Sequence, residues 1–140
     1  MREGAVLCMV GIVGGTIAAA LGGWDHALRA LVLFMVLDFI SGWTVAAVFR
    51  KSKKSKNGSL ESGASYKGLI RKGKALVLVL VAYNIDIVFD INLVRYCVII
   101  GFMATEVLSI VENAGLMGVP VPSILRKIME IFRDNEVSNE

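Results

Sequence analysis

Residues 4–23 form an uninterrupted run of 20 residues without a charged side chain. A run of this length is about what an α-helix needs to cross the hydrocarbon core of a bilayer, which is roughly 30 Å thick. Three further apolar runs are present at residues 27–49, 75–91 and 96–111, and each contains at least one charged side chain. Hydrophobic residues make up 56% of the chain, above the roughly 45–50% of soluble domains. We therefore expect an all-α integral membrane protein.

The number of membrane-spanning helices depends on the third and fourth runs, because acidic residues interrupt both. The first interpretation is about four transmembrane helices, which form a membrane domain over residues 1–114. The alternative has three spans and one interfacial helix. The beginning of the chain, with Arg2, an apolar stretch and Ala18-Ala19-Ala20, also resembles a cleavable signal peptide. We expect it to remain as an anchor, because the first run is long enough to span the membrane.

A basic segment, residues 50–74, separates the second and third runs and contains nine basic residues against the single acid Glu61. Its Ser- and Gly-rich centre includes an Asn57-Gly58 turn signal and indicates a flexible loop. The positive-inside rule places this loop in the cytoplasm, and four spans then place both termini there too. Clustered basic side chains also favour anionic lipid headgroups. The residues that carry these two predictions are Arg50, Lys51, Lys53, Lys54, Lys56, Lys67, Arg71, Lys72 and Lys74.

The tail, residues 115–140, is expected to lie in the cytoplasm. Pro120 and Pro122 separate the fourth helix from the rest of the tail, and Ser123 is a suitable helix N-cap. Apolar side chains then recur at helical spacing opposite charged ones. This pattern predicts a short amphipathic helix that lies on the inner membrane face or packs against a neighbour. The last residues are predicted to be disordered.

Small residues recur along the first run. Gly11 and Gly15 have the GxxxG spacing that lets two helix backbones approach closely in lipid. The same pattern also suits a helix that packs only within its own monomer, so both interpretations remain open. The residues proposed for helix packing are Gly11, Gly15, Ala18, Ala19 and Gly22.

Polar residues inside the later runs form short stripes at helical spacing. A charged Asp or Glu at the centre of a membrane helix costs about 2.5–3.5 kcal/mol on insertion scales, so each needs a partner, a proton or water. Five acids lie within or directly after these runs: Asp38, Asp86, Asp90, Glu106 and Glu112. Arg29 and Arg95 can pair with only one or two of them. We therefore predict that the polar faces turn inward in an assembly or line water. The predicted polar face consists of Asp38, Ser41, Gly42, Asp86, Asp90, Glu106, Ser109, Glu112 and Asn113.

Other classes of site are not supported by the sequence. The chain has one histidine, His26, and its two cysteines lack CxxC spacing, so no metal site is predicted. No nucleophile motif or phosphate-binding loop is present, which argues against an enzyme and against a bound cofactor. The basic residues gather in one segment between apolar runs, which indicates membrane topology rather than nucleic-acid binding.

Six short motifs recur at characteristic spacing along the chain. They are Gly22-Gly23-Trp24-Asp25, Leu37-Asp38-Phe39-Ile40-Ser41-Gly42, Tyr66-Lys67-Gly68-Leu69-Ile70-Arg71-Lys72, Asn84-Ile85-Asp86, Glu106-Val107-Leu108-Ser109-Ile110-Val111-Glu112-Asn113 and Gly118-Val119-Pro120-Val121-Pro122. In this order and spacing they resemble the toxin-secretion/phage-lysis holin family, which includes bacteriophage holins and clostridial toxin-secretion holins. The resemblance covers about residues 22–128. Two features depart from the family pattern: the insertion at residues 52–65 is longer and more basic, and Thr105 stands where Asn is common.

The resemblance implies a multi-pass protein of the bacterial host's cytoplasmic membrane, whose copies form a homo-oligomer and open lesions at host cell lysis. Its functional partner would be a muralytic endolysin that passes through the lesion, or a large toxin cargo. Two other classes stay open on the sequence. One is a small ion channel or transporter that uses the same acids for cation passage. The other is a scaffold or regulator that binds a partner membrane protein.

Overall fold

The structure is a computed structural model, which describes residues 2–51 and 62–137. These residues form helices and no strands. The helices are α1 (Arg2–Ala20), α2 (His26–Thr44), a short π-helical turn η1 (Val45–Phe49) that continues α2, α3 (Ser62–Phe89), α4 (Val94–Leu116) and α5 (Ser123–Val137).

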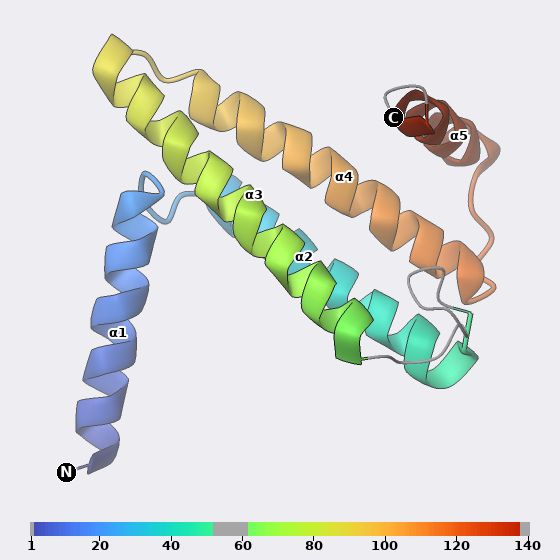
Figure 1. Ribbon diagram of the computed structural model, residues 1–140, viewed down its shortest axis with the longest axis horizontal. Coiled ribbons are helices and arrows are strands. Elements are labelled where there is room, and N and C mark those ends of the chain that lie inside the picture. The colour runs from blue at the N-terminus through green and yellow to red at the C-terminus, as the bar shows by residue number, and fades with distance from the viewer. Residues whose placement is uncertain (1, 52–61, 138–140) are drawn as a thin grey trace.

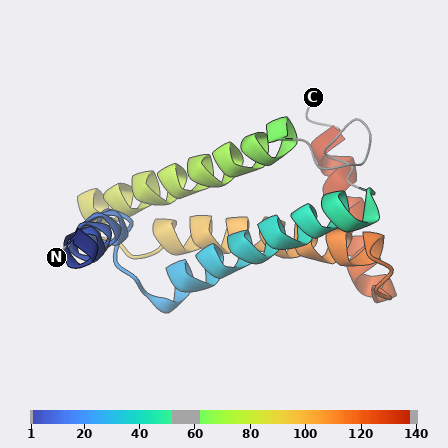
Figure 2. The same ribbon diagram turned by 90° about the horizontal axis from the view of Figure 1, so that it is seen from below.

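Helices α2, α3 and α4 form a bundle (Figures 1 and 2). Helix α2 packs along α4, while α3 lies against α4 and runs in the opposite direction to both. The centre of the bundle is apolar, because Leu28 and Leu31 of α2, Val79 of α3 and Ile99 of α4 are fully buried. Each of these helices therefore has one apolar face that fixes its rotation about its own axis.

Helix α1 points away from this bundle, and the turn that follows its C-terminal end connects it to α2 (Figure 1). None of its residues is buried, and its large side chains from Val6 to Ile17 are all more than half exposed. Apolar residues surround the helix on every side, so water is an unfavourable environment for all of its faces. Such a helix requires lipid or another protein chain as its surroundings.

Helix α5 also lies apart from the bundle (Figure 1). The connection from α4 contains Gly118 in a left-handed conformation, followed by Pro120 and Pro122. The helix begins at Ser123, where the sequence predicts an amphipathic helix. Its apolar side chains Ile124 and Ile131 remain exposed.

Three of the described helices are long and apolar enough to cross a membrane, namely α1, α2 continued by η1, and α4. Helix α3 is not among them, and its length includes the charged residues Lys72, Lys74 and Asp86. The three-span alternative therefore matches the helices that qualify by length and composition. Whether α3 also crosses the membrane depends on how its charges are satisfied.

The basic segment is shorter as a loop than the sequence suggested. Helix α3 begins at Ser62, so residues 62–74, which were predicted to be part of a flexible loop, are helical. The serines and glycine at the start of α3 belong to the Ser- and Gly-rich centre that indicated a loop, whereas the Asn57-Gly58 turn signal lies outside the described residues. Helix propagation is cooperative, however, and the apolar residues on their C-terminal side support extension toward the N-terminus. Residues 52–61 of the predicted loop lie outside the described residues, as do residues 138–140 at the end of the tail, where disorder was predicted for the last residues.

Candidate functional site: a buried ionic cluster

Helix α2 carries Asp38 on its buried face. Leu31 and Met35 lie seven and three residues earlier, on the same side of the helix, and both belong to the buried apolar core. Helical periodicity therefore turns Asp38 toward the bundle interior, where it is 2% exposed. The residue lies near the midpoint of His26–Phe49, the apolar stretch formed by α2 and η1.

Helices α3 and α4 each contribute a charged side chain to the same place. Lys72 lies on the face of α3 that also buries Ala75 and Val79, and it is 8% exposed. Glu106 follows Ile99 by seven residues on the buried face of α4, and it is 9% exposed. Glu106 also lies near the midpoint of its helix.

The three charged groups form one ion-pair cluster. The Lys72 Nζ atom donates to Asp38 Oδ2 at 2.7 Å and to Glu106 Oε2 at 2.5 Å. Removing charges from water is expensive, and such a cluster is maintained only when its geometry and hydrogen bonds compensate for desolvation. One ammonium group thus links three helices at mid-depth in the bundle.

Polar neighbours also contact Asp38. The Asn113 amide nitrogen donates to Asp38 Oδ1 at 3.4 Å and to the Ser41 hydroxyl oxygen at 2.9 Å. The Ser41 hydroxyl donates to the Asp38 backbone carbonyl oxygen at 3.0 Å. Gly42 lies beside this group, since a Cβ atom there would be 3.6 Å from the Asn113 amide nitrogen. We call Asp38, Lys72, Glu106, Asn113 and Ser41 the ionic cluster.

A second polar network lies at the end of the bundle where α4 begins, around Arg95. Its guanidinium group donates to Asp25 Oδ2 at 2.7 Å and to the backbone carbonyl oxygens of Leu21 at 2.5 Å and Gly23 at 3.2 Å. Asp25 is also the N-cap of α2 and accepts from the Leu28 backbone N–H at 2.9 Å. Arg95 therefore connects the turn after α1 to α4.

The carboxyl group of Asp25 is strongly acidic in this network. The hydrogen bond from Arg95 is the largest influence and lowers the pKa of Asp25 from 3.8 to about 2, although partial burial opposes the shift. The group is therefore ionised at any physiological pH. Its ion pair with Arg95 is a permanent part of the fold rather than a switch near neutral pH.

Asp86 performs a structural role that the sequence did not indicate. Its carboxylate accepts backbone N–H bonds from Leu93 at 3.2 Å, Val94 at 2.9 Å and Arg95 at 3.0 Å. These are donors that a helix N-terminus leaves without intrahelical partners, and a carboxylate there also suits the helix dipole. Asp86 thus caps α4 from the neighbouring helix α3.

The predicted polar face therefore divides among several places. Asp38, Ser41, Glu106 and Asn113 come together, with Gly42 beside them. Asp86 caps α4, and Asp90 is exposed at the end of α3 in a left-handed conformation, with φ of 53°. Ser109 and Glu112 instead line a cleft between α4 and α5.

Two expectations about partners need correction. Arg95 pairs with Asp25, which was not among the acids considered, so it does not neutralise any of those five by an ion pair. Lys72, assigned to the topology segment, forms ion pairs with both Asp38 and Glu106. The missed signal is that Lys72 precedes the buried Ala75 and Val79 by three and seven residues on one helix face.

The residues predicted for helix packing in the first run also lie in two different places. Gly11, Gly15, Ala18 and Ala19 lie on α1, whereas Gly22 is in the turn after it, with φ of 93°. A Cβ atom at Gly22 would approach Arg95 Nε to 2.6 Å and Tyr83 Cδ2 to 2.8 Å. Gly22 therefore packs against the Arg95 network instead of an exposed helix face.

Within residues 2–51 and 62–137, no group of three or more His, Cys, Asp or Glu side chains is arranged to hold a metal ion. The polar chemistry of this region consists of ion pairs, hydrogen bonds and helix caps.

Comparison with known proteins adds an independent observation. The model of a family described as the bacteriophage holin family matches residues 15–134. An uncharacterised protein of Listeria monocytogenes is 35% identical over 130 residues, covering 91% of this chain and 87% of the relative. An uncharacterised protein of Clostridium perfringens is 30% identical over 133 residues, covering 91% and 93%. A protein of Bacillus phage phi105 named "Probable holin" is 27% identical over 124 residues, covering 87% and 86%. No solved structure matches this chain.

Proposed function

Because this chain belongs to the bacteriophage holin family, a family of non-enzymatic membrane proteins, we propose that its copies assemble in the bacterial cytoplasmic membrane and open lesions there. The lesions release a muralytic endolysin to the cell wall or, in a toxin-export system, a large toxin. The phage relative named as a probable holin supports this function. The observation that carries it in this chain is the ionic cluster at mid-depth in the bundle.

The charges of the ionic cluster are stable in two environments, the closed bundle and water. In the closed bundle, Lys72 lies between the carboxylates of Asp38 and Glu106 and satisfies both. Turning either carboxylate toward lipid would cost several kcal/mol, whereas turning it toward water would not. Separation of α2, α3 and α4 is therefore coupled to the entry of water, which is what the opening of an aqueous lesion requires.

The cluster also supports a fourth membrane crossing by α3. Helix α3 runs antiparallel to α2 and α4 and packs with them. Lys72 forms ion pairs with acids of both neighbouring helices, α2 and α4. The Asp86 carboxylate accepts a hydrogen bond from a backbone N–H group at the N-terminus of α4. With four crossings and the N-terminal end of α3 on the cytoplasmic side, both termini lie in the cytoplasm.

Helix α1 provides the surface through which copies associate. It is exposed along its whole length in the monomer, and its Gly11 and Gly15 leave open space where a Cβ atom would lie. Small residues with this spacing allow close contact between helices in lipid, where packing drives association. The remaining exposed faces of α1 contact lipid.

The decisive experiment is inducible expression in a bacterial host that contains a cytoplasmic reporter enzyme and no endolysin. We expect the reporter to leave the cells abruptly at a reproducible time. The variant Asp38→Asn combined with Glu106→Gln should change that time, because the charges that hold the closed bundle are absent. A matched control, Asp90→Asn, changes an exposed acid outside the cluster and should leave the timing as in the wild type.

A small cation channel is the second candidate, because two carboxylates lie at mid-depth in the bundle. The same expression experiment separates the two functions. A channel would depolarise the membrane while the reporter enzyme stays inside the cells. That result would contradict a lesion-forming function. A scaffold that needs a partner protein would produce neither effect on its own.

A further inference from the structure

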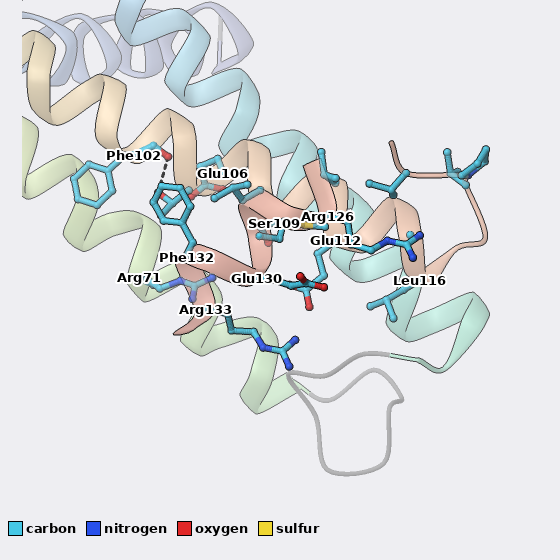
Figure 3. Close-up of a pocket in the computed structure, with 18 of the residues that line it drawn as sticks. Arg71, Phe102, Glu106, Ser109, Glu112, Leu116, Arg126, Glu130, Phe132 and Arg133 are labelled. Carbon is cyan, nitrogen blue, oxygen red and sulfur yellow. Dashed lines mark hydrogen bonds between the residues drawn. The ribbon is translucent and has the colours of Figure 1, made fainter. Parts of the chain in front are cut away.

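A cleft of about 690 Å³ lies between α4 and α5, with one edge formed by α3 (Figure 3). It extends along α4 from Leu116, at the end of that helix, to Phe102. At roughly 30 Å³ for each molecule, this volume has room for about twenty waters. Glu106 is the member of the ionic cluster that lines the cleft. The cleft therefore reaches the ionic cluster from the side of α4.

Charged side chains of both signs line the cleft and come from three helices. Arginines and glutamates are present in equal number, so their charges select neither an anion nor a cation. Within the described residues, none of the three arginines makes a hydrogen bond or an ion pair. Water satisfies charges of both signs, whereas lipid satisfies neither. The charged residues that line the cleft are Arg71 of α3, Glu106 and Glu112 of α4, and Arg126, Glu130 and Arg133 of α5.

The inner part of the cleft lies deep in the bundle. Glu106 precedes Leu116 by ten residues, which is about 15 Å along the helix and about half of a roughly 30 Å hydrocarbon core. Arg71 directly precedes Lys72 of the ionic cluster and lines the same space. A charged side chain at that depth is costly in lipid and therefore faces a partner or water. The charges at the inner end of the cleft thus require water there.

Helix α5 forms the outer wall of the cleft. Its Met129 and Phe132 line the cleft together with Leu108 and Val111 of α4. The helix makes few direct contacts with the bundle, and its connection to α4 contains Gly118 in a left-handed conformation, with φ of 89°. An element with few buried contacts separates from the rest of a protein at low cost. Movement of α5 therefore changes the width of the cleft without disturbing the centre of the bundle.

We propose that the cleft is a water-filled vestibule that leads from the cytoplasmic face of the membrane to Glu106, and that α5 is its lid. This inference rests on the membrane orientation of the proposed function. Movement of α5 away from α4 admits more water to the Glu106 carboxylate, and its return excludes that water. Separation of Glu106 from Lys72 costs less when water replaces the lost ion pair. Opening of the bundle therefore begins on the α4 side of the ionic cluster.

Labelling of single cysteines tests the vestibule in the full-length protein. Cys8 and Cys97 are first replaced by serine, and Ser109→Cys then places a thiol in the cleft. Val107→Cys is the matched control, because Val107 is two residues away on α4, exposed and outside the cleft. Inside-out membrane vesicles, prepared from cells before reporter release, are treated with two membrane-impermeant thiosulfonates, one cationic and one anionic. Both reagents should label Ser109→Cys at least about ten-fold faster than Val107→Cys, because the thiolate is the reactive form and apolar surroundings raise the pKa of a thiol.

The lid is tested in the Ser109→Cys background. Phe132→Ser removes an apolar side chain from the α5 wall and should speed labelling by about five-fold, because the closed position of α5 loses apolar contact. Ile131→Ser is the matched control, since Ile131 is exposed on α5 and outside the cleft. It should leave the labelling rate unchanged. Equal effects of the two substitutions would overturn the role of α5 as a lid.

Three results would overturn the vestibule itself: equal labelling of Ser109→Cys and Val107→Cys, reaction with only one of the two reagents, or labelling only from the outer face of intact cells. Val111→Cys also lies in the cleft, nearer the end of α4, and gives the same comparison if Ser109→Cys is not inserted into the membrane. Reporter release by the wild type is measured separately. A dry cleft would therefore leave the proposed lesion function standing, and a retained reporter would refute that function without changing the labelling result.

Discussion

Replacing Lys72 with methionine removes the ammonium group that lies between two buried carboxylates and leaves the length of the side chain nearly unchanged. Lys72 Nζ lies 2.7 Å from Asp38 Oδ2 and 2.5 Å from Glu106 Oε2, and the side chains of Lys72, Asp38 and Glu106 are 10%, 3% and 11% exposed. Removing one partner from a buried ion pair costs about 3–5 kcal/mol, because the other charge remains desolvated. The ratio of folded to unfolded protein should fall by roughly two to four orders of magnitude.

The assay is unfolding of the full-length protein in mixed micelles with increasing dodecyl sulfate, monitored by circular dichroism. Lys74→Met is the matched control, because Lys74 lies two residues further along α3 and is exposed. We expect a change of at most about 0.5 kcal/mol there. Adding Asp38→Asn and Glu106→Gln to Lys72→Met should restore most of the lost stability, since the stranded charges are then absent. Equal effects of Lys72→Met and Lys74→Met would refute the conclusion that the cluster holds the bundle closed.

Three further substitutions probe the turn after α1, the Asp25–Arg95 ion pair and the exposed face of α1. Gly22→Ala should lower the free energy of unfolding in the same micelle assay by about 1–3 kcal/mol, because the added Cβ would lie 2.6 Å from Arg95 Nε. Gly23→Ala has a similar backbone strain, with φ of 96° and open space around the Cβ, so equal losses would rule out the close contact as the cause. Asp25 has a pKa lowered from 3.8 to about 2 by Arg95, so its ion pair adds stability above about pH 4 and loses it as the pH falls toward 2. The difference in free energy of unfolding between wild type and Asp25→Asn should therefore disappear as the pH falls from about 4 to 2. A difference that is independent of pH would contradict the stabilising role of the Asp25–Arg95 ion pair. Gly15→Leu should reduce self-association of α1, measured by cross-linking in bilayers, whereas Val13→Leu on the opposite side of the helix should not; equal effects would remove α1 as the contact between copies.

Local sequence pattern was sufficient for the class of fold and for the positions of most helices. An apolar run long enough to span a bilayer has few alternatives to a helix, because the backbone must satisfy its hydrogen bonds internally in lipid. The same reasoning made an unpaired Asp38 or Glu106 too costly and required partners for them. Residue 38 and residue 106 were therefore recognisable as special from their place in the apolar runs.

The identity of those partners depended on tertiary structure. Lys72 is 34 residues from both Asp38 and Glu106 in sequence, and its basic neighbours made it resemble a residue of a cytoplasmic loop. Only the extension of α3 to Ser62 and its packing against α2 and α4 bring the ammonium group between the two carboxylates. Asp86 and Asp25 show the same limit, since their partners also lie on other helices.

The sequence by itself thus determined that the acids within the apolar runs could not face lipid alone, because the cost of desolvating a charge depends on the residue and its depth. The tertiary structure decided which cation or helix terminus satisfies each acid, because ion pairs and caps form between groups that are distant along the chain. It also placed Arg71, Arg126 and Arg133 around one cleft, although two come from α5 and one from α3. Such groupings are set by how helices pack, and no local pattern records them.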